Sequence, residues 1–109
     1  MLEELFSPQK TFKVAIGSYE MKMSHWVDQP YLIRVSDDVE LFNLNGDPWS
    51  ASDVTWLDDS TVKMHLRRYP GHIFCTIQLN ALTDQGSAIS PSGTYAGSLS
   101  QVQNWVMNL

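Results

Sequence analysis

Residues 61–80, TVKMHLRRYPGHIFCTIQLN, contain two alternations of apolar and polar residues on either side of Pro70-Gly71. Alternation with a period of two is typical of strands that bury one face, and Pro-Gly is a turn dipeptide. A turn at this position gathers the apolar residues on one face through the following pairs: Val62 with Leu79, Met64 with Ile77, Leu66 with Cys75 and Arg68 with Ile73. A shift by one residue would mix the two faces. We therefore predict an antiparallel hairpin of residues 61–69 and 72–80 in this register.

The opposite face of this hairpin explains several reactive side chains without catalysis. The register pairs Lys63 with Gln78, His65 with Thr76, Arg67 with Phe74 and Tyr69 with His72. Arg67 over the Phe74 ring is a cation–π pair. Cys75 falls on the apolar face, and no base lies beside it in the sequence, so we expect a core residue and not a nucleophile. Because L-Pro-Gly favours a type II turn, a four-residue loop in the same register is the alternative.

The same alternation extends towards the amino terminus. Residues 12–16 and 19–23 flank Gly17-Ser18 and predict a second hairpin with a type II′ turn. The remaining strand candidates, bounded by turn-forming Asp, Asn, Gly and Ser residues, are 31–35, 39–44 and 54–56. Leu2, Leu5 and Phe6 favour a short amino-terminal helix or arm. The chain from residue 12 to residue 80 therefore reads as an antiparallel meander.

The carboxyl-terminal part of the chain has a different pattern. Residues 80–97 are rich in turn formers, and we expect loops with at most one edge strand there. Ser98 and Gln101 match a capping box, and apolar residues follow at a spacing of three and four. This pattern predicts a helix from about Leu99 to Met107 that packs on the sheet. The expected fold class is α+β, with residues 1–109 forming a single domain: about six to eight strands, either open or curved towards a barrel, and one carboxyl-terminal helix.

Composition and charge exclude several classes of protein. The chain has 109 residues, of which 43% are hydrophobic and 17% charged, enough apolar surface for a folded core without disulfides. The net charge of −5 argues against a nucleic-acid partner, because such binding needs clustered Lys and Arg. The amino terminus lacks the pattern of a leader, and no apolar run approaches the roughly 18 residues of a membrane span. With Cys75 as the lone cysteine, we expect a cytoplasmic protein without a membrane partner.

The search for catalytic and metal-binding motifs is negative. The sequence contains no phosphate-binding glycine loop, zinc-protease, nucleophile-elbow or Cys-x-x-Cys motif. Of the three histidines, His25, His65 and His72, only the last two are expected near each other. We therefore predict no catalytic residue, no metal site and no cofactor.

Acidic residues are concentrated in one stretch. From Val35 to Val62 the sequence contains no Lys or Arg, yet it holds more than half of the acidic residues. Aspartate pairs at turns are explained by turn chemistry alone, but the missing basic residues are not. We predict that this stretch binds a partner through the following residues: Asp37, Asp38, Glu40, Asp47, Trp49, Asp58 and Asp59. Whether Trp49 and Trp56 lie in the core or at the surface stays open at this stage.

Three classes of function remain. The first is a non-catalytic module that offers an acidic, aromatic surface to a basic protein, as inhibitors and immunity proteins of nucleases do; this is an analogy of charge and not of family. The second is a small-ligand carrier with a pocket between sheet and helix. The third is a small enzyme using His72 with Arg67 and Tyr69. The negative motif search favours the non-catalytic module.

Overall fold

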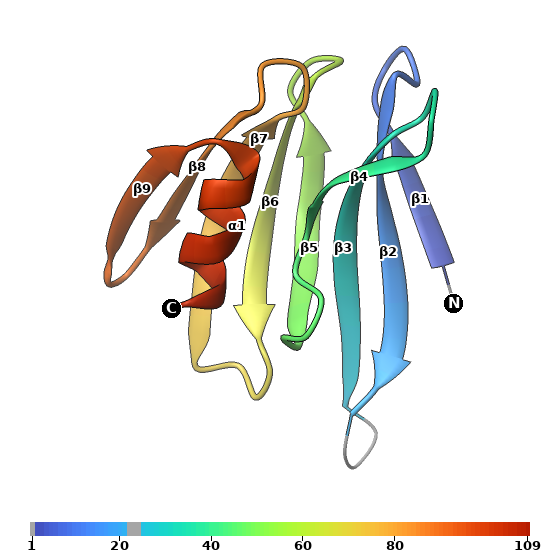
Figure 1. Ribbon diagram of the computed structural model, residues 1–109. Helices are drawn as coiled ribbons and strands as arrows, with labels where there is room; N and C mark the ends of the chain where they lie inside the picture. Colours follow the sequence, from blue (N-terminus) through green and yellow to red (C-terminus); the bar gives the residue numbers. More distant parts are fainter. Residues whose placement is uncertain (1, 22–24) are drawn as a thin grey trace.

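Two antiparallel sheets and one helix make up the computed structural model, which describes residues 2–21 and 25–109 (Figure 1). The first sheet has the order β1 (Leu2–Phe6), β2 (Phe12–Glu20), β3 (Trp26–Arg34) and β4 (Val39–Asn43). The second sheet has the order β5 (Trp49–Trp56), β6 (Thr61–Arg68), β7 (Ile73–Asn80), β8 (Gln85–Ser90) and β9 (Gly93–Gly97). The helix α1 (Leu99–Met107) follows β9.

The predicted hairpin of β6 and β7 is confirmed. The two strands pair in the predicted register, so that Leu66 lies opposite Cys75 and Val62 opposite Leu79. Cys75 is buried, as expected for a core residue. Residues 69–72 form a four-residue loop, which leaves the register unchanged. The apolar face therefore selects the pairing, and the loop adapts to it.

The outer face of this hairpin matches the prediction in part. The Arg67 guanidinium carbon lies 5.2 Å from the centre of the Phe74 ring, which confirms the cation–π pair. Arg67 also donates from Nη1 to the Gly71 carbonyl oxygen at 2.6 Å. Tyr69 and His72, which we expected as the last cross-strand pair, lie in the loop instead.

The helix α1 begins and packs as predicted. Ser98 Oγ accepts the Gln101 N–H at 3.2 Å, and Gln101 Oε1 accepts the Ser98 N–H at 2.9 Å, which completes the capping box. Figure 1 shows the helix lying across the second sheet, with its buried residues Leu99, Val102 and Val106 in the common core. Capping and apolar spacing thus place one helix on this sheet.

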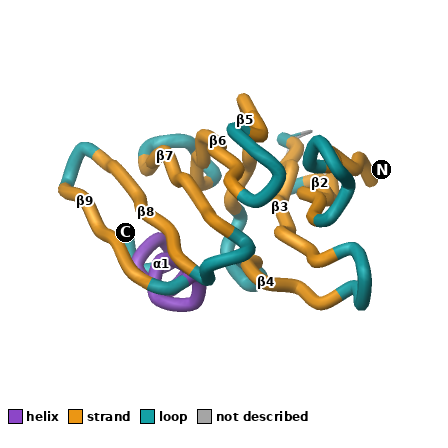
Figure 2. The backbone as a smooth tube through the Cα atoms, turned by 90° about the horizontal axis from the view of Figure 1, so that it is seen from above, coloured by secondary structure: helices purple, strands orange, loops and turns teal. Residues whose placement is uncertain are grey.

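The two sheets share one core. It combines residues of β2, β3 and β4 with the inner faces of β6 and β7, and Trp49 at the start of β5 is fully buried within it. The Trp56 Nε1–H donates to the Leu5 carbonyl at 3.0 Å, and the Asp28 N–H donates to Ser50 Oγ at 3.0 Å. Figure 2 shows β4 and α1 on the same side of the long strands. In the described part of the chain both sheets keep open edges, so of the two alternatives, an open sheet or a barrel-like one, the barrel is not formed.

The predicted hairpin at Gly17-Ser18 is wrong. β2 runs through both residues and pairs with β1 on one side and β3 on the other. Ser18 donates its hydroxyl to the Asp28 carboxylate at 2.7 Å, and a Cβ atom added at Gly17 would lie 3.5 Å from the Tyr31 ring, an ordinary van der Waals contact. Met23, which we expected in the second arm, lies outside the described residues.

Three further expectations need correction. Residues 85–97 form two strands, β8 and β9, where we expected loops with at most one edge strand. Residues 2–6 form an edge strand and not a helix or arm. The described strands number nine in two sheets, where we expected about six to eight in one meander. β8 and β9 contain mostly small and polar residues, so their alternation carries little apolar signal.

The buried position of Ile77 at the centre of the second sheet yields a stability prediction. Ile77→Ala should lower the free energy of unfolding by about 2–5 kcal/mol, because the side chain is fully buried and its removal leaves a cavity. Ile89→Ala is the control, since Ile89 is 62% exposed, and it should change stability by less than about 0.5 kcal/mol. Urea unfolding of both variants measures the difference. Equal losses would contradict the burial described here.

Candidate functional site

Four connections between strands lie at one end of the molecule, at the top in Figure 1. They join β1 to β2, β3 to β4, β5 to β6, and β7 to β8. We call this end the turn surface and define it as residues 6–11, 35–39, 57–60 and 81–84.

Hydrogen bonds hold the four turns to one another. Neighbouring turns are joined by three of them: Val35 N–H to the Thr11 carbonyl (3.1 Å), Gln9 N–H to Asp59 Oδ1 (2.7 Å) and Ala81 N–H to the Ser60 carbonyl (2.7 Å). Each bond connects segments that are far apart in the sequence. The turn surface is therefore one composite surface and not a set of independent loops.

The aspartates of the turn surface stabilise the turns and also carry its negative charge. Asp58 Oδ1 accepts the backbone N–H groups of Ser60 and Thr61 at 2.9 and 2.8 Å, which closes the β5–β6 turn. Asp38 and Asp84 each adopt a φ of 57°, in the left-handed region that aspartate tolerates better than most residues. The same side chains thus shape the backbone and place negative charge at this end.

Three of these carboxylates have lowered pKa values. The side-chain hydroxyls of Thr11 and Ser7, with the Gln9 N–H, lower the pKa of Asp59. Hydrogen bonds from Ser60 and Thr61 lower the pKa of Asp58, and the Arg34 guanidinium lowers that of Asp37. Hydrogen bonds to the ionised form favour it, so these three groups are negatively charged at neutral pH.

Exposed apolar side chains accompany the aspartates. Half of the eight exposed large hydrophobic residues in the described part of the chain lie on the turn surface: Phe6, Val39, Leu57 and Leu82. Leu82 is 73% exposed and Leu57 is 52% exposed, each within two residues of an aspartate. Exposed apolar residues that gather in one region with a polar rim mark interaction sites, whereas singly scattered ones do not.

The structure brings together four of the seven residues predicted to bind a partner. Asp37, Asp38, Asp58 and Asp59 lie on the turn surface. Glu40 is exposed on β4, directly after this surface. These five carboxylates therefore occupy one region of the molecule.

Asp47 and Trp49 lie elsewhere. Asp47 is in the β4–β5 loop at the opposite end, 3.7 Å from the Arg68 guanidinium. Trp49 is fully buried, so the open choice between core and surface is answered in favour of the core, and its side chain offers no surface to a partner. Trp56 is half-buried against the same core. The sequence pattern left Trp49 open because burial depends on the first sheet, which covers it from a distance in the chain.

The acidic stretch is less isolated in space than in the sequence. Arg34, which immediately precedes the basic-free stretch, donates to the Asp37 carboxylate from Nε at 2.9 Å and from Nη2 at 2.7 Å. Arg68, which follows it, compensates Asp47. The described residues form three ion pairs, and neither Asp38 nor Asp84 belongs to them. Asp58 and Asp59 accept backbone N–H groups at 2.7–2.9 Å, whereas Asp84 accepts only a long bond from the Leu99 N–H at 3.4 Å. Asp38 and Asp84 are therefore the aspartates of the turn surface that we single out for contacts with a partner.

Leu57, Leu82 and Asp84 were missed by the sequence analysis. An isolated leucine has no periodicity that marks it as exposed, and single leucines are usually assigned to the core. The available signal was a leucine inside a turn-forming segment, Leu57 before Asp58-Asp59 and Leu82 before Thr83-Asp84. A leucine in such a segment lies outside the strand alternation that directs apolar side chains to the core.

The residues considered for catalysis have separate neighbours. Arg67 is engaged by the Phe74 ring and the loop backbone, as described above. The Tyr69 ring meets the His25 ring edge-on, with ring centres 5.4 Å apart. His72 is exposed in the β6–β7 loop. Within residues 2–21 and 25–109, no group of three His, Cys, Asp or Glu side chains is arranged to hold a metal ion.

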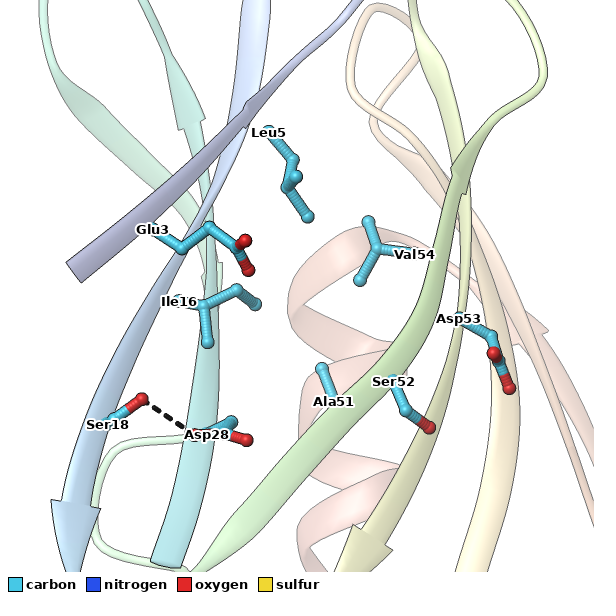
Figure 3. A pocket seen from close by; sticks show the side chains of 9 residues that line it. All are labelled: Glu3, Leu5, Ile16, Ser18, Asp28, Ala51, Ser52, Asp53 and Val54. Carbon is cyan, nitrogen blue, oxygen red and sulfur yellow. Dashed lines mark hydrogen bonds between the residues drawn. The ribbon is translucent and has the colours of Figure 1, made fainter. Parts of the chain in front are cut away.

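An open hollow of about 410 Å³ lies between the first sheet and β5 (Figure 3). Glu3 and Ile16 point into it from one side, and Ala51 and Val54 from the other. Asp28 lies at its lower rim. The lining is mixed: four apolar residues line it together with two serines and the three carboxylates of Glu3, Asp28 and Asp53. This combination suits a small molecule with an apolar part and a cationic group.

Comparison of the chain with protein-family models, curated proteins and solved structures gives no match. Among the described residues, no helix has the length and apolar character needed to cross a bilayer.

Asp59 yields a prediction on the pH dependence of stability. Its folded-state pKa lies below the ordinary value of 3.8, so the ionised form stabilises the fold above that value. This contribution is lost as the pH falls through the folded-state pKa. Asp59→Asn should therefore lower the urea midpoint at about pH 6, and the difference from the unchanged protein should shrink below about pH 3.5.

The matched control for Asp59→Asn is Ser52→Ala, an exposed residue that does not titrate. Its effect on the urea midpoint should be the same at both pH values. A difference for Asp59→Asn that stays constant with pH would contradict the stabilising role of this carboxylate.

Proposed function

We propose that the protein is a non-catalytic binding module whose turn surface binds a basic protein partner, in the manner of an inhibitor or immunity protein. The observation that carries this proposal is the hydrogen-bonded row of four turns, which presents Leu57 and Leu82 among aspartates. A surface held together in this way loses little conformational freedom on binding. The aspartates make it complementary to a positively charged protein.

The two kinds of residue have different roles in this proposal. Leu57 and Leu82 bury apolar area against the partner and contribute most of the affinity. Asp38 and Asp84 steer the approach of the partner, and they act mainly on the association rate and on its dependence on salt. Because the net charge of the chain is −5, its field attracts a basic partner and repels nucleic acid.

We also propose that the protein is located in the cytoplasm. Cys75 is a free, buried thiol, and burial raises its pKa to about 11. A thiol with so high a pKa stays protonated at neutral pH and is a poor nucleophile. This fits a structural role in a reducing compartment.

Small-ligand binding is the second candidate function, and the hollow between the first sheet and β5 favours it. A cationic amphiphile would place its apolar part against Ile16 and Val54 and its charge near Glu3 or Asp28. Leu5 and Ala51 complete the apolar lining. Because the hollow is open to solvent, we rank this function below protein binding.

Capture from extracts of the natural source tests the proposed function. Asp38→Asn combined with Asp84→Asn removes two charges and keeps residues that tolerate a positive φ. We expect this variant to bind the captured partner with slower association and a weaker dependence on salt between about 50 and 300 mM. Leu82→Ala should weaken the affinity for the same partner by about 30-fold. This corresponds to a loss of about 2 kcal/mol, as expected for a contact at the centre of an interface.

Matched controls are available for both variants. Asp53→Asn alters an exposed aspartate on β5 that also has a positive φ, and Ile89→Ala alters an exposed apolar residue on β8. Both controls should bind the partner like the unchanged protein. The proposal would be refuted if the control variants lost binding of the partner while the turn-surface variants kept it. Binding that does not change with salt concentration would also refute it.

A further inference from the structure

The last 25 residues of the chain, Gln85 to Leu109, contain no Asp, Glu, Lys, Arg or His. These residues form β8, β9 and α1. All charged side chains of the protein therefore lie in the first 84 residues, although the net charge is −5. One part of the molecular surface is neutral, and the remainder is predominantly negative.

β9 is the outermost strand of this neutral part. Figures 1 and 2 both show it at the border of the molecule, with β8 on one side and no strand on the other. Thr94 and Ala96 are exposed, and a Cβ atom added at Gly93 would meet no atom within 4 Å. An edge strand of this kind presents unpaired N–H and C=O groups to solvent.

The other three edge strands in the described part of the chain are protected. β1 carries the exposed Glu3 and Glu4, β4 donates the Asn43 N–H to the Gln103 side chain of α1 at 2.9 Å, and β5 is interrupted by a bulge at Asp53. Charges, covering elements and bulges are the usual protections against pairing between edges. β9 has an uninterrupted ladder with β8 and none of these features.

We propose that β9 pairs with β9 of a second copy of this chain, in antiparallel orientation about a two-fold axis. Charge argues for a second copy as the occupant. Two molecules with a net charge of −5 repel each other, and the repulsion is smallest where neutral surfaces meet. A two-fold axis also places each residue near its own counterpart, so a charged residue beside the axis would face its own charge.

The register of the pairing follows from the length of β9. All five residues are opposed only when Tyr95 lies on the axis, with Thr94 opposite the partner's Ala96 and Gly93 opposite the partner's Gly97. Tyr95 stacks on Trp105 of α1, with ring centres 5.8 Å apart and planes 13° apart. The two Tyr95 rings then meet at the axis, each supported by its own tryptophan.

The pairing joins two five-stranded sheets into one. Because the opposed strands run in opposite directions, the turn surfaces of the two copies lie at opposite ends of the joined sheet. The dimer therefore leaves both turn surfaces free. The inference is independent of the proposed function, and either can fail without the other.

Sedimentation equilibrium of the full chain over about 5 to 500 µM tests the inference, because a five-residue contact predicts a weak, concentration-dependent dimer. We expect a transition from 12.4 kDa to twice that mass. Thr94→Glu combined with Ala96→Glu opposes like charges across the axis and should weaken the dimer at least about tenfold. The control, Ser52→Glu with Gln78→Glu, makes the same change in net charge at exposed positions away from β9 and should dimerise like the unchanged protein.

A charge-swap experiment tests the register directly. Chains with Thr94→Lys and Ala96→Lys should be monomeric alone, but should form heterodimers when mixed with the Thr94→Glu and Ala96→Glu chains, because each Lys then opposes a Glu. Native mass spectrometry distinguishes the three species. The inference is overturned if the unchanged protein stays monomeric at about 500 µM, if the Glu variant dimerises as well as its control, or if the mixed chains form no heterodimer.

Discussion

Burial of the inner face of β6 and β7 is the constraint on which the rest of the structure depends. The paired residues of this face are apolar from Val62 to Leu66 on β6 and from Cys75 to Leu79 on β7, and they must be covered. α1 covers one part of the face, and Trp49 and the first sheet cover another. The Asn43 N–H bond to Gln103 joins the first sheet to α1 directly. A single core thereby positions both sheets and the helix.

The turn surface is a consequence of this arrangement. When the second sheet and the first sheet close over one core, alternate connections of the two meanders come to lie at the same end. Bonds such as Gln9 N–H to Asp59 then join connections that the sequence separates by 50 residues. The aspartates serve local geometry first and surface charge second. The charge of the aspartates acts on a partner at a distance. The neighbouring Leu57 and Leu82 contribute affinity only in direct contact, so the surface combines long-range attraction with short-range binding.

The candidate site was predictable only in part. The acidic stretch contains Asp37, Asp38, Asp58 and Asp59, which lie at one end of the structure because they occupy turns that share this end. Their predicted role in binding a partner stays a prediction. Compensation of Asp37 was within reach of the sequence, because Arg34 lies only three residues before it. Compensation of Asp47 was not, because its partner Arg68 lies on β6, in a different segment of the chain. Exposure of individual apolar residues was likewise invisible, because exposure depends on what other segments cover.

The sequence by itself determined the β6–β7 register, the burial of Cys75 and the start of α1 at Ser98. These features depend on periodicity and on caps, which act between residues that are close in the chain or joined by one turn. Tertiary structure alone decided that Gly17-Ser18 continues a strand, and that Trp49 is core. A dipeptide that favours a turn stays in a strand when neighbouring strands on both sides form hydrogen bonds with its backbone. The burial of a residue depends on the elements that cover it. Both are non-local, so no pattern within one segment encodes them.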